Sequence, residues 1–188
     1  WAVGSTTGAP PSNSFILRYT NGSWQIQRTF TGVTLESIAM TSTTDGWITG
    51  SRDDTSGAAP GTNPATLLLM RYVNRQWVDA TSTIANANAL GSLLDVTMRT
   101  PTDGWMTCQK ADFKGVPTLL HYDGTRWTEW SLPALANTSA WDIRGVTTLS
   151  ATVGWAVGEH EVKDSNYATL VNAVILHYHG GVWSVVNS

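Results

Sequence analysis

Aromatic and charged side chains that could recognise a ligand gather around one tryptophan. Trp141 is followed by Asp142 and Arg144, a combination suited to stacking on a sugar ring or anchoring a partner protein. Trp130 is a second candidate of the same kind. Packing between neighbouring elements is the alternative, favoured for Trp130 and evenly balanced with binding for Trp141. All four are candidate binding residues.

Histidine and glutamate suggest two further kinds of chemistry. Glu159 and His160 are adjacent and could act as a general acid–base couple or as binding residues, although a solvated loop pair is favoured. His177 and His179 share one face of a predicted strand and could ligate a metal. The position of His177 carries Arg in two other copies of the repeat described below, which favours an ordinary polar position. We predict no metal and no cofactor.

The bulk composition excludes several classes of partner. The chain has 188 residues, 13% charged residues and a net charge of −3, without the basic surface that a phosphate backbone requires, so nucleic acid is not an expected partner. No run of about 20 apolar residues predicts a membrane span. The single cysteine, Cys108, has no partner for an internal disulfide. Nucleophile-elbow and phosphate-loop motifs are missing, so we do not expect an enzyme.

The tryptophans that surround these candidates mark four internal repeats. In one motif Trp is followed three residues later by Gly, or by Cys in the third copy; in a second motif Trp lies five residues after Tyr. The first motif starts at Trp1, Trp47, Trp105 and Trp155, and the second spans Tyr19–Trp24, Tyr72–Trp77, Tyr122–Trp127 and Tyr178–Trp183. Eight of the ten tryptophans therefore occupy repeat positions, which leaves Trp130 and Trp141 outside.

Each repeat reads as four short strands separated by turns. Asp-Gly precedes the first tryptophan in two copies, and Asn-Gly, Asp-Gly or Gly-Gly lies between Tyr and Trp in three. The segment that precedes the first motif, such as Leu35–Met40, has only three copies. We predict one all-β domain over residues 1–188, with repeat units near 1–46, 47–104, 105–154 and 155–188.

Four strands per unit and a period near 50 residues are typical of β-propeller blades. We therefore predict a propeller-type fold of four antiparallel blades, the first of which lacks its inner strand. Such a blade leaves an unpaired edge, so we expect either a fragment of a longer chain or an assembly of identical chains. A closed four-bladed ring is the third alternative.

The repeats resemble those of bacterial propellers with Trp-Ala-Val-Gly motifs, related to the photosystem II assembly factor and to the Asp-box, sialidase-type propellers. The segments Tyr19–Trp24 and Tyr122–Trp127 are similar to the Asp-box hairpin, Ser-x-Asp-x-Gly-x-x-Trp, but about one residue shorter. Sialidases of this kind carry an arginine triad, a Tyr–Glu pair and an acidic residue on a chain about twice this length. Their Phe/Tyr-Arg-Ile-Pro motif does not occur here, so the resemblance implies a fold rather than catalysis.

The connections that differ most among the repeats join the second to the third strand and the fourth strand to the next repeat. In an up-and-down blade these loops emerge on one face, which is where we predict the binding site. We expect a non-catalytic binding or scaffolding module that recognises a protein or glycan there.

Two alternative functions remain. The chain could be a structural subunit of a surface or filament assembly that self-associates through its open blade edge, or, as the less favoured choice, a fragment of a glycan-cleaving enzyme. Abundant Thr, Ser, Asn and Gly, with little Lys and Glu, predict an extracellular or cell-surface location, with the periplasm as a variant.

Overall fold

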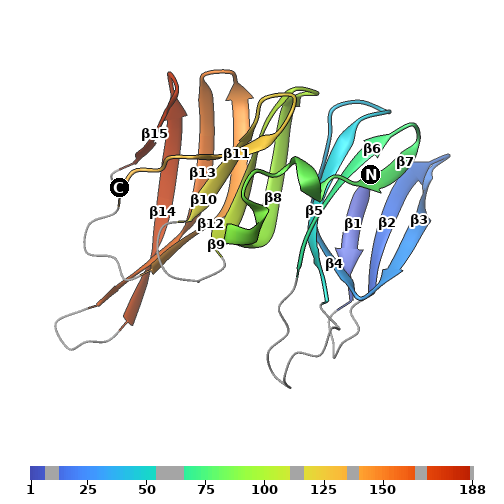
Figure 1. Ribbon diagram of the computed structural model, residues 1–188, viewed down its shortest axis with the longest axis horizontal. Helices are drawn as coiled ribbons and strands as arrows, with labels where there is room; N and C mark the ends of the chain where they lie inside the picture. Colours follow the sequence, from blue (N-terminus) through green and yellow to red (C-terminus); the bar gives the residue numbers. More distant parts are fainter. Residues whose placement is uncertain (7–12, 54–65, 111–116, 135–139, 164–168, 187–188) are drawn as a thin grey trace.

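The computed structural model describes residues 1–6, 13–53, 66–110, 117–134, 140–163 and 169–186. The described chain forms strands β1 to β15 and two short 3-10 helices, arranged as four antiparallel sheets that follow one another in chain order (Figure 1). We call these sheets blades 1 to 4. The predicted all-β fold of propeller-like blades is confirmed.

Blade 1 has three strands and each of the others has four, paired in sequence order. Blade 1 comprises β1 (Ala2–Ser5), β2 (Asn13–Thr20) and β3 (Ser23–Thr31); blade 2 comprises β4 (Val33–Met40), β5 (Gly46–Arg52), β6 (Thr66–Val73) and β7 (Gln76–Asp79). Blade 3 comprises β8 (Leu90–Thr100), β9 (Asp103–Lys110), β10 (Thr118–Tyr122) and β11 (Trp127–Trp130), and blade 4 comprises β12 (Ala140–Ser150), β13 (Val153–Lys163), β14 (Thr169–His179) and β15 (Val182–Val185). The 3-10 helices η1 (Thr81–Thr83) and η2 (Ala87–Ala89) lie between blades 2 and 3.

Successive blades pack through their inner strands. Strand β4 contacts β1 and β2, β8 contacts β4 and β5, and β12 contacts β8 and β9. Blades 1 and 4 lie at opposite ends of the array in Figure 1, so the described blades form an open array and not the closed four-bladed ring. Among the described residues, blade 1 has no counterpart of β4, β8 and β12, as predicted.

The hydrophobic core lies between the blades. In each interface the first-motif Trp of one blade packs against the Tyr and the second-motif Trp of the next; we call these three rings an interblade triad. Between blades 1 and 2, the ring centroid of Trp1 lies 5.1 Å from that of Tyr72 and 5.7 Å from that of Trp77. Between blades 2 and 3, the centroid of Trp47 lies 5.0 Å from that of Tyr122 and 5.4 Å from that of Trp127. Between blades 3 and 4, the centroid of Trp105 lies 5.1 Å from that of Tyr178 and 5.3 Å from that of Trp183. Tilted and T-shaped pairs at these distances are favourable aromatic geometries. The repeated tryptophans therefore hold the blades together.

Hydrogen bonds between the inner strands also connect the blades. Ser37 Oγ on β4 donates to Asp95 Oδ1 on β8 at 2.7 Å, and the Val146 N–H on β12 donates to Asp95 Oδ2 at 2.9 Å. The register of each inner strand shifts at this level, between Leu35 and Ser37 in β4 and at the equivalent places in β8 and β12, and such a bulge turns backbone groups out of the ladder. One carboxylate thus links the inner strands of three blades.

The turn between β10 and β11 is closed by a side chain. Asp123 Oδ1 accepts hydrogen bonds from the Thr125 hydroxyl at 2.7 Å, the Thr125 N–H at 2.8 Å and the Arg126 N–H at 2.9 Å. These bonds, first that of the Thr125 hydroxyl and then those of the two N–H groups, lower the pKa of Asp123 from 3.8 to about 2, because they favour the ionised carboxylate.

Asp123→Ala is expected to lower the free energy of unfolding in a pH-dependent manner. A carboxyl whose pKa is lower in the folded state stabilises that state above its unfolded pKa, and the contribution is lost as the pH falls. The difference between wild type and variant should be complete above pH 3.8 and disappear as the pH approaches 2, measured by urea unfolding at a series of pH values. Asp123→Asn, which does not titrate, is the control. A difference between wild type and Asp123→Ala that is constant down to pH 2 would contradict this role.

Candidate functional site

Five of the sequence-predicted residues lie together on the paired strands β12 and β13: Trp141, Asp142, Arg144, Glu159 and His160. The register pairs Trp141 with His160 and Asp142 with Glu159, and it shifts just after Ile143. Asp142 and Arg144 are two residues apart on β12, a spacing at which strand side chains point to the same side. The sixth predicted residue, Trp130, lies on the outer strand β11 and does not belong to this group.

Arg144 binds two carboxylates at the surface of blade 4. Its Nη2 lies 2.9 Å from Glu159 Oε1 and 3.2 Å from Asp142 Oδ2. Gln109, at the end of β9 in blade 3, donates from Nε2 to the same Asp142 oxygen at 2.7 Å. We call these four residues the Arg144 cluster. The Arg144 side chain is mostly exposed, whereas the Asp142 side chain is largely buried. The cluster therefore presents a solvent-accessible guanidinium that is paired with a buried carboxylate.

Gln109 is the member that the sequence did not reveal as a site residue. It stands one position after Cys108, where the repeat motif ends, and no residue pattern marks it. Its contact with Asp142 joins two blades, so only the packing of blade 4 on blade 3 brings it into the site. Asp142 Oδ1 is buried without a hydrogen-bond partner among the described residues, which leaves one acceptor in the cluster unused.

Trp141 does not present its ring at the surface. The side chain is buried in the cluster of apolar residues between blades 3 and 4, together with Ile143 two positions later. Side chains two residues apart point to the same face of a strand, so the buried face of β12 carries both. The packing alternative therefore describes Trp141, and stacking on a sugar does not.

Glu159 and His160 lie on β13 and not in a loop, contrary to expectation. As neighbours on a strand they point to opposite faces, and Glu159 pairs with Arg144 instead of with the imidazole. The Nδ1 atom of His160 is buried without a hydrogen-bond partner in the described part of the chain. The structure thus separates the proposed acid–base couple.

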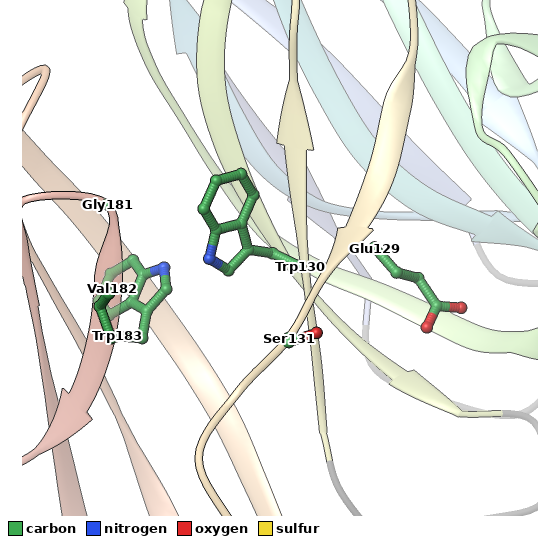
Figure 2. A pocket seen from close by; sticks show the side chains of 6 residues that line it. All are labelled: Glu129, Trp130, Ser131, Gly181, Val182 and Trp183. Carbon is green, nitrogen blue, oxygen red and sulfur yellow. The ribbon is translucent and has the colours of Figure 1, made fainter.

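Trp130 lines a groove on the outer side of blades 3 and 4. The groove has a volume of about 440 Å³ and is bounded by Glu129, Trp130, Ser131, Gly181, Val182 and Trp183 (Figure 2). Trp130 is half-buried and packs edge-on against Trp105 at 5.1 Å. Figure 2 shows its indole and that of Trp183 on facing sides of the groove, with the Glu129 side chain directed away. Trp130 therefore both packs against Trp105 and lines the groove.

The histidine pair of β14 is an aromatic stack. The ring centroids of His177 and His179 lie 5.9 Å apart, with an angle of 28° between the ring planes. The ring of His177 also stacks on that of Trp155, with 4.2 Å between the centroids. Within the described ranges no three His, Cys, Asp or Glu residues are grouped to hold a metal ion. Burial is the main cause that raises the pKa of the Cys108 thiol to about 12, so this thiol is protonated near neutral pH.

The predicted variable loops fall mostly outside the described residues, namely 7–12, 54–65, 111–116, 135–139 and 164–168. The Arg144 cluster lies near the strand ends that lead into two of them. Gln109 is next to the last residue of β9, and Asp142 follows the start of β12 by two positions. The predicted variable connection 81–92 is described and contains η1 and η2.

The structure defines the chain as an all-β protein built of antiparallel, propeller-like blades. Searches against protein-family models and against curated proteins found no match. Among the residues that the structure describes, no helix has the length and apolar character needed to cross a membrane.

Proposed function

We propose that the chain is a non-catalytic binding or scaffolding module that recognises a glycan or a protein through the face that carries the Arg144 cluster. The observation that carries this proposal is the cluster itself, in which donors and acceptors are held in fixed positions at the junction of two blades. Sugar hydroxyls and peptide groups are recognised by such arrays, because each ligand group finds a partner of the opposite hydrogen-bonding type.

The support beneath the cluster favours binding. Asp142 and Gln109 belong to different blades, and the core between these blades holds Trp105, Trp141 and Ile143 fully packed. Side chains on strands are positioned more precisely than side chains on loops, which reduces the entropy lost on binding. Asp142 and Glu159 are both engaged by one guanidinium, an arrangement that can orient a ligand.

Arg144→Ala is expected to weaken glycan binding about tenfold or more, because a hydrogen bond to a charged group contributes about 1.5–3 kcal/mol. The test is a panel of immobilised neutral and acidic oligosaccharides probed with labelled wild type and variant. Arg99→Ala is the matched control, since Arg99 is also ion-paired, with Asp103 at 2.5 Å, but lies at the hairpin between β8 and β9. Equal losses for both variants, or none for Arg144→Ala, would reject the cluster as the site.

The same preparation tests the enzyme alternative. We expect no turnover of chromogenic glycosides, and turnover that disappears with Glu159→Gln would replace the binding proposal by a glycan-cleaving one. We also infer that the repeats are of the Trp-Ala-Val-Gly and Asp-box type and that the chain acts at the cell surface or outside the cell; the supporting observations are the repeated Trp positions and the composition.

A structural subunit is the second candidate function. It is favoured by the edge strand β1, which pairs only with β2 among the strands that the structure describes, because an unpaired edge can accept a strand from another chain.

A further inference from the structure

Trp130 stands at a repeat position where no other blade carries an aromatic residue. It lies three residues after the second-motif Trp127, and the same position holds Gln27 in blade 1, Ala80 in blade 2 and Val186 in blade 4. The half-buried Trp130 side chain forms one wall of the groove between β11 and the β14–β15 hairpin. Trp130 therefore gives the junction of blades 3 and 4 a feature that the repeat does not supply elsewhere.

The walls of this groove are held by a buried aromatic cluster. Trp130 and Trp183 lie on facing sides of the groove (Figure 2), and both pack edge-on against Trp105, which is 3% exposed. The ring of His121 lies 5.4 Å and that of Tyr178 6.3 Å from the ring of Trp130, measured between centroids. Because these rings fix both walls, the groove is formed before a ligand binds, which lowers the entropy cost of binding.

A buried hydrogen-bond donor points into the groove. Trp183 is 2% exposed, and its Nε1 atom has no hydrogen-bond partner in the described part of the chain. Figure 2 shows the ring nitrogens of Trp183 and Trp130 on the edges that face each other. A buried indole N–H ordinarily finds an acceptor, so this pair of donors points to a ligand that carries acceptors.

The facing pair of indoles distinguishes this junction from the other two. The Nε1 atoms of Trp77 and Trp127, the equivalents of Trp183, also have no partner among the described residues. The position that faces them on the preceding blade holds Gln27 and Ala80, neither of which supplies a second ring. Only the junction of blades 3 and 4 thus combines two indoles with a groove among the described blades.

The groove offers donors rather than acceptors. An indole N–H donates a hydrogen bond and has no lone pair to accept one. The carboxylate of the lining, that of Glu129, is directed away from the groove and pairs with Lys110 at 2.6 Å. Sugar hydroxyls donate as well as accept, so a sugar would bring donors that this lining does not match. A ligand with carbonyl acceptors and few donors fits better.

We propose that the groove binds a proline-rich segment of a partner protein in the polyproline II conformation. An X-Pro amide has a carbonyl acceptor and no N–H donor, and the pyrrolidine ring is an apolar group of a size to lie between two indoles. Polyproline II segments dock in aromatic-lined grooves with little loss of conformational entropy. The volume of about 440 Å³ lies within the range of small-ligand sites and suits a short segment.

This site is separate from the Arg144 cluster and does not rest on the function proposed for it. Trp130 and Trp183 belong to the outer strands β11 and β15, whereas the cluster is built on β9, β12 and β13. Because Glu129 is paired with Lys110, the groove also differs in charge from the cluster, and we expect an uncharged segment to bind. Either site can fail its test without affecting the other.

NMR spectroscopy of the indole N–H groups tests the proposal, with an oligoproline peptide of about ten residues, or about three turns of polyproline II, as the probe. The Trp130 signal, identified by its absence in Trp130→Phe, should move on addition of the peptide. Trp130→Ala should weaken binding about tenfold or more, the effect of removing an aromatic anchor. Trp130→Phe, which keeps a ring but loses the N–H, should weaken it about fivefold, the contribution of one hydrogen bond.

Two variants are controls. Trp155→Ala removes an indole from blade 4 outside the groove lining, and Arg144→Ala removes the centre of the other site; both should bind the peptide like wild type. Circular dichroism of each variant checks the fold, and Trp130→Phe is the conservative change if Trp130→Ala does not fold.

Four results would overturn the proposal. They are a Trp130 signal that stays in place at millimolar peptide, equal losses for Trp130→Ala and Trp155→Ala, and a Gly-Ser peptide of the same length that binds as tightly as oligoproline. The fourth is a neutral oligosaccharide that moves the Trp130 signal when the peptide does not, which would assign the groove to a glycan.

Discussion

Trp47→Ala is expected to lower the free energy of unfolding by about 3–5 kcal/mol, the range found when a buried aromatic side chain is truncated to alanine. The Trp47 ring is fully buried between blades 2 and 3, where it meets Tyr122 at 5.0 Å and Trp127 at 5.4 Å. The Arg71 guanidinium lies 5.0 Å from its ring centroid and adds a cation–π contact. Truncation removes all of these contacts and leaves a cavity at the centre of the array.

Trp155→Ala is the matched control for this substitution. It removes the same side chain from the same repeat position, but in blade 4 the ring is 37% exposed and stacks on His177. We expect the loss to be less than half of that for Trp47, measured by urea unfolding. Equal losses would mean that the contacts between blades 2 and 3 contribute little, and would contradict the assignment of the core to the blade interfaces.

Gly158→Ala is expected to be the most damaging small substitution, with a loss of about 3 kcal/mol, the upper part of the usual range for overpacking. A Cβ at this position would overlap the backbone carbonyl oxygen of Asp142 on β12, and a backbone atom has no rotamer by which to yield. Gly50 faces Thr34 in the same way in blade 2. The glycine is required where the inner strand passes close to the Trp-x-x-Gly strand.

Gly4→Ala tests the same position without the inner strand. A Cβ on Gly4 would meet no atom within 4 Å, so this variant should be as stable as wild type or more stable by up to about 1 kcal/mol. Thermal unfolding of both variants supplies the comparison. If Gly4→Ala and Gly158→Ala lose equal stability, the close approach of β12 is not the reason for the glycine.

Cys108 shows how one blade avoids this constraint. It occupies the glycine position in blade 3, fully buried, and the neighbouring strand β8 has an additional register shift between Leu90 and Ser92. Strands β4 and β12 have no register shift at the equivalent place, and there a Cβ on the glycine would overlap the backbone. The sequence identified the position of Cys108 in the repeat, but the register of the neighbouring strand depends on backbone geometry that no residue type specifies.

The candidate site was only partly predictable. Residue type singled out the charged groups near Trp141, and alternation on the strand could also have shown that Trp141 shares the buried face of Ile143. The ion pairs of Arg144 with Glu159 and Asp142 require the register of two strands far apart in sequence, and the contact of Gln109 with Asp142 requires the docking of two blades. These long-range relations leave no local signature.

The sequence alone determined the number of repeats, the strands of each blade and the positions of the repeated aromatic residues, because strand alternation, turn residues and periodicity are local properties of the chain. Only the tertiary structure decided which of these aromatic residues are buried. Trp47 and Trp155 occupy the same place in the repeat, yet one is enclosed and the other is exposed. Burial depends on whether another blade packs on the ring in the described structure, and that contact is not encoded in the residues beside the tryptophan.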